Sequence, residues 1–335
     1  TDYVDLNAHL TMDSGTFNLY GGGQPSRWAW AADASLEMVS GNLIFHDVGV
    51  KIETAGGHSF AESITDGGIS IAGSFTVLNS SFTPEGGGVY LNGAGNSSIL
   101  LASGSYLQDL SVYIPEGTSL TAMSDLDING DFKLLRGIFA APNVMNVAGD
   151  WFNQSGAADF IEGTGKVVFD ANLDSEISFA EDFCQLELAK DYSFREAVIG
   201  GGIDVSCQSY DWTEGRLRVS GGSFTALDLA DPGVKGIFHL QDGNVDLSQD
   251  ASQAIDLLGE VSVEAGNFWI RGGSGTSRWP YSEDASLTLS GGTLDVTDQA
   301  ILINASSYSL ASAVSGGNIR CSKGFAITRS DFQPT

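Results

Sequence analysis

The chain has 335 residues, of which 42 are acidic and 15 basic, and its formal net charge at pH 7 is −27. This charge excludes proteins that bind nucleic acid or anionic membranes through Lys and Arg, and no apolar run approaches the roughly 20 residues of a membrane-spanning helix. Charged residues make up 17% of the chain and Gly is abundant, which is typical of a turn-rich all-β protein.

The longest feature is an internal repeat. Gly15–Glu53 returns without a gap as Gly266–Asn304, and after one residue of slip Phe75–Pro84 returns as Phe325–Pro334. Self-similarity at a long fixed spacing indicates a repeat architecture. We therefore expect residues 1–335 to form a single domain that carries two related segments, 15–84 and 266–334.

A short pattern, Gly-x-apolar-x-apolar, recurs along the chain. It starts at Gly15, Gly41, Gly73, Gly87, Gly130, Gly165, Gly215, Gly236, Gly243, Gly266, Gly292 and Gly317. Alternation with period two predicts strands with one buried face, and the leading Gly allows a tight bend.

Several of these patterns lie near 25 residues apart, as from Gly15 to Gly41, whereas a sandwich has turns every 8–12 residues. We expect a single-stranded, right-handed parallel β-helix of roughly 13 coils, in which each coil buries its inner face on the next. A tandem array of β-sandwiches is the alternative fold.

Two local features leave alternatives open. Ala180–Val198 is rich in helix formers and has few turn residues, so helix and strand are both open, although the alternation of Cys184–Leu188 favours a strand. Cys184, Cys207 and Cys321 lack the spacing of a metal site and are expected to be small buried residues. A Cys184–Cys207 disulfide is the alternative for that pair.

One segment carries a resemblance to a family. Asn146–Ala171 reads as a Gly-Asp-Trp strand, a Phe-containing turn, a GTG and an alternating strand that ends in Phe-Asp-Ala, and Gly86–Ser98 matches part of it. These segments resemble the degenerate repeats of large secreted β-helix proteins from Bacteroidota and related environmental bacteria. The resemblance implies a β-helix that is exported or displayed on the cell surface. Such proteins often end in a type 9 secretion sorting domain, which the residues after Gly317 do not resemble.

Catalytic signatures are missing from the sequence, so we expect no enzymatic activity. Polysaccharide lyases need clustered acidic Ca²⁺ ligands with a basic residue, and related hydrolases need paired carboxylates. The histidines are scattered, at His9, His46, His58 and His239. Asp125, Asp127 and Asp131 resemble a cation loop only slightly and are expected to be turn residues. No cofactor is predicted, and Ca²⁺ binding is left open.

Two Ser-Arg-Trp segments interrupt the strand pattern and are the candidate contact sites. The candidate residues are Arg27, Trp28, Trp30, Arg278, Trp279 and Tyr281. Trp and Arg are enriched in binding hot spots, and aromatic rings stack on sugars. We expect projecting loops that contact another protein or a carbohydrate. In the alternative, each loop folds back over the core, with Arg27 paired to Asp33 and Arg278 to Asp284.

These observations favour an extracellular or cell-surface structural protein. It would be a subunit of a filament, sheath or adhesin that acts by self-association and rigid display. The expected partners are copies of the same chain, through the Ser-Arg-Trp segments and the strand edges at the ends of the stack. A carbohydrate-binding or polysaccharide-active β-helix, with a polysaccharide as partner, is the alternative function.

Overall fold

The computed structural model describes residues 5–21, 24–28, 34–46, 49–53, 61–171, 175–189, 196–199, 202–214, 216–226, 233–234, 237–249, 255–272, 275–280, 285–304, 310–329, 332 and 334. The chain is all-β, and its parallel strands stack as a β-solenoid of about 10 turns. This confirms the predicted class of fold and is incompatible with a sandwich array, because the ladders are parallel. The number of turns is a little lower than the roughly 13 coils predicted by dividing the length by one period.

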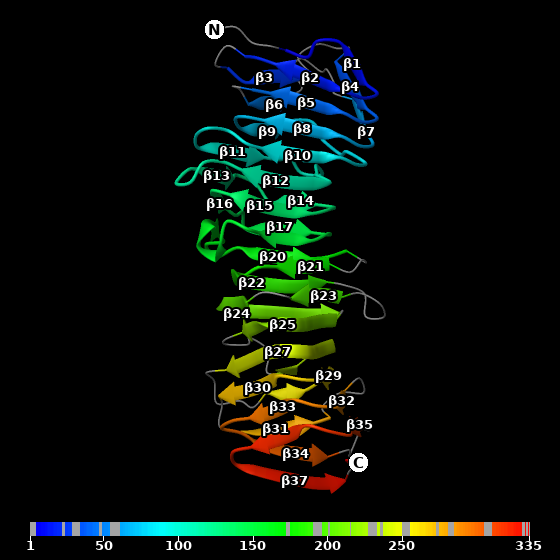
Figure 1. The fold of residues 1–335 in the computed structure, drawn as a ribbon, viewed down its shortest axis with the longest axis vertical. Coiled ribbons are helices and arrows are strands. Elements are labelled where there is room, and N and C mark those ends of the chain that lie inside the picture. The colour runs from blue at the N-terminus through cyan, green and yellow to red at the C-terminus, as the bar shows by residue number, and fades with distance from the viewer. Residues whose placement is uncertain are drawn as a thin grey trace. The chain divides into compact units, whose positions relative to one another are not determined.

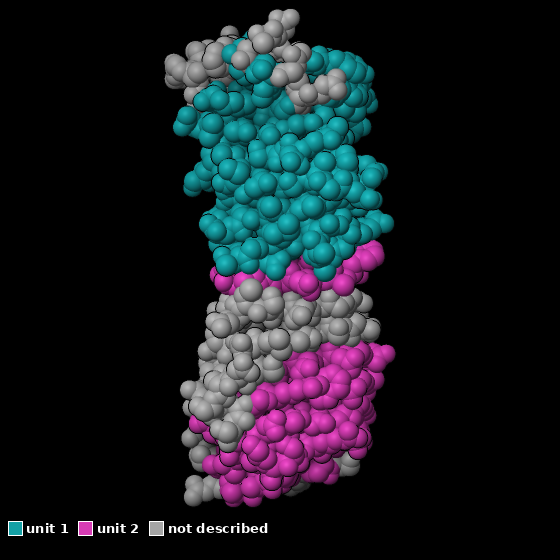
Figure 2. All heavy atoms as spheres, turned by 90° about the vertical axis from the view of Figure 1, so that its left-hand side faces the viewer, with its two compact units in different colours: residues 1–165 teal, residues 166–335 magenta. Residues whose placement is uncertain are grey.

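The chain divides into two compact units, Thr1–Gly165 and Lys166–Thr335 (Figure 2). Within each unit, strands of successive coils lie side by side in parallel (Figure 1). Among the described residues, no helix is long and apolar enough to cross a membrane.

Unit 1 is built from three faces of stacked strands. Its strands are β1 (His9–Met12), β2 (Thr16–Leu19), β3 (Ser26–Trp28), β4 (Ser35–Met38), β5 (Asn42–Phe45), β6 (Val50–Glu53), β7 (Ala61–Ile64), β8 (Gly68–Ile71), β9 (Phe75–Leu78), β10 (Gly88–Leu91), β11 (Ser97–Leu100), β12 (Asp109–Tyr113), β13 (Ser119–Ala122), β14 (Leu126–Ile128), β15 (Phe132–Arg136), β16 (Ile138–Ala140), β17 (Val144–Val147), β18 (Trp151–Asn153) and β19 (Phe160–Ile161), with a 3₁₀ turn η1 at Ala157–Asp159. The ladders are β1-β4-β7, β2-β5-β8-β10-β12-β15-β18 and β3-β6-β9-β11-β13-β16-β19, and β14 pairs with β17.

Unit 2 continues the same type of stacking. Its strands are β20 (Lys166–Phe169), β21 (Ser175–Ser178), β22 (Glu181–Ala189), β23 (Glu196–Ile199), β24 (Gly202–Glu214), β25 (Arg216–Ala226), β26 (Gly233–Val234), β27 (Ile237–Gln249), β28 (Asp256–Leu257), β29 (Glu260–Val263), β30 (Asn267–Gly272), β31 (Thr276–Trp279), β32 (Ser286–Leu289), β33 (Thr293–Val296), β34 (Ala300–Asn304), β35 (Ala311–Val314), β36 (Asn318–Cys321) and β37 (Gly324–Arg329). Near its C-terminal end the ladders are β27-β30-β33-β36, β27-β29-β32-β35, β26-β28 and β31-β34-β37.

Among the described residues, the core consists of columns of inward-facing apolar side chains, in which each coil adds side chains from its different strands. In unit 1, Leu43, Ile69, Val89, Leu110, Phe132 and Trp151 lie opposite one another in register and are at most 4% exposed. The Trp151 ring lies 4.6 Å from that of Phe132 and 4.8 Å from that of Phe160. Burying one such side chain contributes about 1.5–3 kcal/mol, so the stack is stable only because each level covers the next.

The two sequence repeats adopt the same strands. β1, β2, β4 and β5 return 251 residues later as β29, β30, β32 and β33. The edge-to-face contact between Phe75 and Phe82 also returns, as Phe325 with Phe332. The two segments are therefore the same set of coils used twice.

The described parts of Ala180–Val198, the segment that could be helix or strand, are strands. β22 runs from Glu181 to Ala189, and its Phe183, Leu186 and Leu188 are fully buried. Cys184 is also buried, whereas the side chain of Cys207 lies outside the described residues, so the disulfide stays a prediction.

Candidate functional site

The two Ser-Arg-Trp segments are strands, so the prediction of projecting loops is wrong. They form β3 and the end of β31, in which Ser and Trp face inward and Arg faces outward. The indoles of Trp28 and Trp279 are 1% exposed and belong to the core. Trp30 and Tyr281 lie outside the described residues.

Both arginines are engaged by aspartates of the preceding coil. The Arg27 Nε donates to both carboxylate oxygens of Asp5, at 3.0 and 3.1 Å, and its backbone N–H donates to the same carboxylate at 3.1 Å. Arg278 repeats the arrangement with Asp256, with its backbone N–H at 2.8 Å and Nε at 3.1 and 3.0 Å. In each pair Nη2 also contacts the carboxylate. One carboxylate thus satisfies a backbone donor and a guanidinium together.

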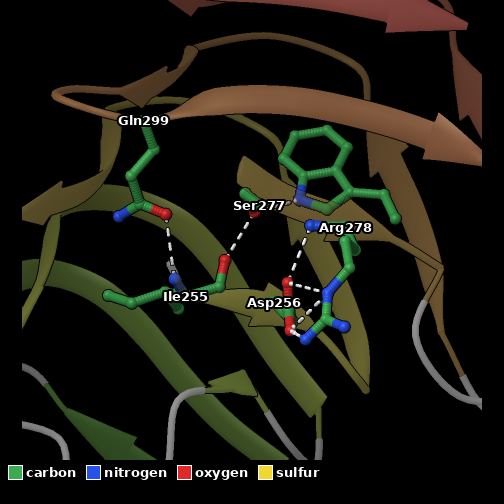
Figure 3. A network of polar contacts seen from close by, with 6 residues as sticks. Ile255, Asp256, Ser277, Arg278 and Gln299 are labelled. Carbon is green, nitrogen blue, oxygen red and sulfur yellow. Dashed lines mark hydrogen bonds and ion pairs between the residues drawn. The ribbon is translucent and has the colours of Figure 1, made fainter. Parts of the chain in front are cut away.

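A buried polar network surrounds the second pair (Figure 3). The Ser277 hydroxyl donates to the carbonyl of Ile255 and accepts from the indole N–H of Trp279 at 2.8 Å. The side-chain oxygen of Gln299 accepts the backbone N–H of Ile255 at 2.8 Å. These bonds fix the short β28 segment against β31. They join neighbouring coils and satisfy buried polar groups of both segments within the fold.

Sequence reasoning missed the aspartates that hold the arginines. It had paired Arg27 with Asp33 and Arg278 with Asp284, two residues that lie outside the described part of the chain. The observed partners, Asp5 and Asp256, are themselves 251 residues apart. A comparison extended upstream of Gly15 would have found them, since Val4-Asp5-Leu6 matches Ile255-Asp256-Leu257.

Two aspartates of the slight cation-loop pattern accept backbone N–H groups, whereas Asp127 lies on β14 and not in the expected turn. The carboxylate of Asp125 accepts the backbone N–H of Val144 at 3.0 Å, and that of Asp131 accepts the N–H of Asp150 at 2.9 Å. Burial raises the pKa of Asp127. Within the described residues, no group of three or more His, Cys, Asp or Glu could hold a metal ion.

The N-terminal end of unit 1 presents an uncovered apolar interior. A hollow of about 180 Å³ there is lined mainly by Leu6, Leu10, Phe17, Leu19, Trp28 and Phe45. Phe17 is 44% exposed, although Leu43 beneath it is fully buried. Among the described residues, β2 pairs with β5 alone, so no described strand lies along its other edge.

The C-terminal end of unit 2 is uncovered as well. Phe325 and Ile327 on β37 lie opposite the buried Ile301 and Ile303 of β34, yet are 45% and 48% exposed. In the described part of the chain, β36 pairs only with β33. Each end therefore exposes apolar side chains whose partners on the neighbouring described strands, Leu43 at one end and Ile301 and Ile303 at the other, are buried.

Comparison with known proteins gives no family for this chain: no family model, no curated protein and no solved structure matches it.

Proposed function

We propose that this chain is an extracellular or cell-surface structural protein, a non-catalytic subunit of a filament, sheath or adhesin. It acts by self-association and by rigid display of its outer faces. The observation that carries the proposal is the pair of uncovered coils, with Phe17 exposed at one end and Phe325 and Ile327 exposed at the other. A strand edge beside exposed apolar side chains is a template for pairing with another chain.

Contacts between the two exposed edges would join copies head to tail. The exposed edges belong to different strands, β2 and β36, so a contact between them joins two unlike surfaces. A contact between unlike surfaces leaves one free surface of each kind and therefore propagates into a filament unless its rotation closes a ring.

Sedimentation velocity over a hundredfold range of protein concentration, with negative-stain images of the same samples, tests this function. We expect species that grow with concentration and images of elongated assemblies of repeated subunits. A monomer at every concentration, with single particles in the images, would contradict the proposal.

A second candidate function, carbohydrate binding, has one specific observation in its favour. An open hollow of about 470 Å³ in unit 1 is lined by Tyr113, Glu116, Arg136, Gln154 and Asp159, among others. Tyr113 is 54% exposed and the Arg136 guanidinium lies 6.0 Å from the centre of its ring. An exposed aromatic side chain with polar side chains around it can stack on a sugar ring and form hydrogen bonds to its hydroxyl groups.

Affinity electrophoresis in gels that contain pectin, alginate or xylan tests this second candidate. Tyr113→Ala should abolish retardation if the hollow binds sugar, whereas Tyr90→Ala, an exposed tyrosine outside the hollow, should leave it unchanged. Equal migration of wild type in all gels and in a gel without polysaccharide would argue against the candidate.

A further inference from the structure

The second copy of the repeat shows what covers the coil that is uncovered in the first copy. Phe268 on β30 is the counterpart of Phe17 on β2, and it is fully buried. It is covered by β27, in the register Asn244 opposite Asn267, Val245 opposite Phe268 and Leu247 opposite Ile270. The coil beneath is the same in both copies, so the difference in exposure comes from the covering strand.

The stacked glycines also differ between the two copies, because a covering coil lies above Gly266 but not above Gly15. Gly266 has φ +75°, and a Cβ there would lie 2.0 Å from the carbonyl oxygen of Gly243 in the covering coil. Gly15 has the matching φ of +88°, but a Cβ there would meet no atom within 4 Å. The backbone of Gly243 occupies the space above Gly266, and the equivalent space above Gly15 is empty and could take another backbone.

The C-terminal end of the chain carries a strand of the type that fills this place. Gly317-Asn318-Ile319-Arg320-Cys321 repeats the pattern of Gly243-Asn244-Val245-Asp246-Leu247. The preceding strands, β35 and the first part of β27, lie at the same spacing without a gap. The strand β36 thus has the pattern of the strand that covers β30.

Charge is also complementary between the two ends. Residues 310–329 contain Arg320, Lys323 and Arg329 and no acidic residue, although acidic residues outnumber basic ones almost threefold in the whole chain. Residues 5–21 contain Asp5 and Asp13 and no Lys or Arg. Opposite charges favour contact between these ends over contact between two like ends.

We propose that a second copy of this chain is the occupant: β36 of one copy pairs in parallel with β2 of the next. Ile319 lies opposite Phe17 and Cys321 opposite Leu19, and the Thr16 N–H donates to the carbonyl of Gly317. The same bond joins successive coils within unit 2, from Thr293 N–H to the Gly266 carbonyl at 2.9 Å. This inference rests on the proposed self-association and assigns its surface and register.

The register has a consequence for the segment before β1. In unit 2 the covering coil runs from β27 into β28, which is the counterpart of Asp5–Leu6, whereas β36 runs into β37. If β36 covers β2, then β37 and Asp5–Leu6 would occupy the same position in the stack, next to β3. β37 pairs along all of β34, while Leu6 makes a single bridge to Trp28. In the contact, β37 replaces Asp5–Leu6, and this covers Phe325 and Ile327.

A disulfide trap tests the register. Opposite residues on adjacent strands have Cα atoms about 4.8 Å apart, within the range of a disulfide. Leu19→Cys should therefore give dimers and higher multimers on non-reducing gels after mild oxidation, through Cys321 of the next copy. Leu19→Cys combined with Cys321→Ser is the matched control, which should stay monomeric. A ladder that persists in this control, or is missing in Leu19→Cys, would overturn the register.

Assembly variants separate this interface from the proposed function. Ile319→Asp should raise the concentration needed for assembly at least tenfold, and Ile161→Asp, an exposed apolar residue of unit 1, should leave it unchanged. If wild type assembles but Ile319→Asp assembles equally well and the trap fails, the interface is wrong and the function stands. If wild type stays monomeric, the function itself fails.

The replacement of Asp5–Leu6 has its own test. Asp5→Asn weakens the hold of Arg27 on this segment and should lower the concentration needed for assembly by up to about fivefold, the factor for one partly exposed ion pair. Asp13→Asn removes the same charge without touching Arg27 and serves as control. Assembly that is unchanged or weaker in Asp5→Asn, relative to Asp13→Asn, would overturn the replacement.

Discussion

The repeated Asp–Arg pair allows one substitution to be compared in two settings. Asp256→Ala removes the acceptor of the Arg278 backbone N–H, a half-buried donor whose lost hydrogen bond costs about 1–3 kcal/mol where no other acceptor replaces it. The Asp256 carboxylate is 2% exposed but the Arg278 side chain is 49% exposed, so loss of the ion pair itself adds at most about 1 kcal/mol. We expect Asp256→Ala to lower local stability by about 2–3 kcal/mol.

Asp5→Ala should cost less, about 1 kcal/mol, because the Asp5 carboxylate is 10% exposed at the uncovered end, where water can replace it. Hydrogen exchange followed by mass spectrometry measures both, at protein concentrations too low for assembly. A loss of 2 kcal/mol speeds exchange of β31 about thirtyfold.

Asp256→Asn is the informative control for this prediction. It removes the charge but keeps a side-chain oxygen that can accept the Arg278 N–H, so it should recover most of the loss. If Asp5→Ala speeds exchange of β3 as much as Asp256→Ala speeds exchange of β31, the assignment of the cost to burial of the backbone donor is refuted.

Three further substitutions test the core, the glycine stack and a desolvated carboxylate. Trp151→Ala removes the ring that packs on Phe132 and should cost about 3–5 kcal/mol in urea unfolding; a cost below 1 kcal/mol would contradict the packing. Gly292→Ala places a Cβ 2.7 Å from the Gly266 carbonyl at φ +68° and should lower stability by more than about 1 kcal/mol in the same assay. Burial raises the pKa of Asp127, so its charged form destabilises the fold at neutral pH and this penalty disappears as the pH falls below the usual value of 3.8. Asp127→Asn should therefore be more stable than wild type at pH 7 and equal to it below that value in a thermal melt; the reverse order at pH 7 would contradict this.

Much of the fold follows from the sequence because each level of a solenoid obeys local rules. The alternation after Gly15, Gly41 and Gly266 predicted strands with one buried face, and all three are strands with a neighbour in parallel. The buried face is present in β5 and β30 but not in β2, where Phe17 is exposed. The alternation of Cys184–Leu188 favoured a strand over the helix that the composition of Ala180–Val198 left open, and β22 confirms the strand, because packing on neighbouring coils overrides a weak helix propensity.

The candidate sites were harder to predict because the same residue types serve binding and packing. Arg next to Trp is frequent in interfaces, but Ser26-Arg27-Trp28 also alternates inward, outward and inward, which is the pattern of a strand. Whether Arg27 serves binding or packing depends on its partner, and that partner, Asp5, lies 22 residues away in sequence. Local sequence does not report a contact across one coil, whereas a repeat that carries Asp and Arg together at both ends does.

The two copies of the repeat show how a neighbouring coil changes the burial of the same Phe side chain, which is Phe17 in the first copy and Phe268 in the second. A Phe side chain can bury about 150–250 Å², so the exposed 44% of Phe17 corresponds to about 90 Å². Burying this area would contribute about 2 kcal/mol of hydrophobic stabilisation. The counterpart Phe268 has already gained it under β27. Covering Phe17 with Ile319, and Phe325 and Ile327 in the same step, yields several kcal/mol per contact before the cost of association is subtracted. Only a partner with an alternating strand in the right register can gain this hydrophobic stabilisation, and β36 of a second copy is such a strand.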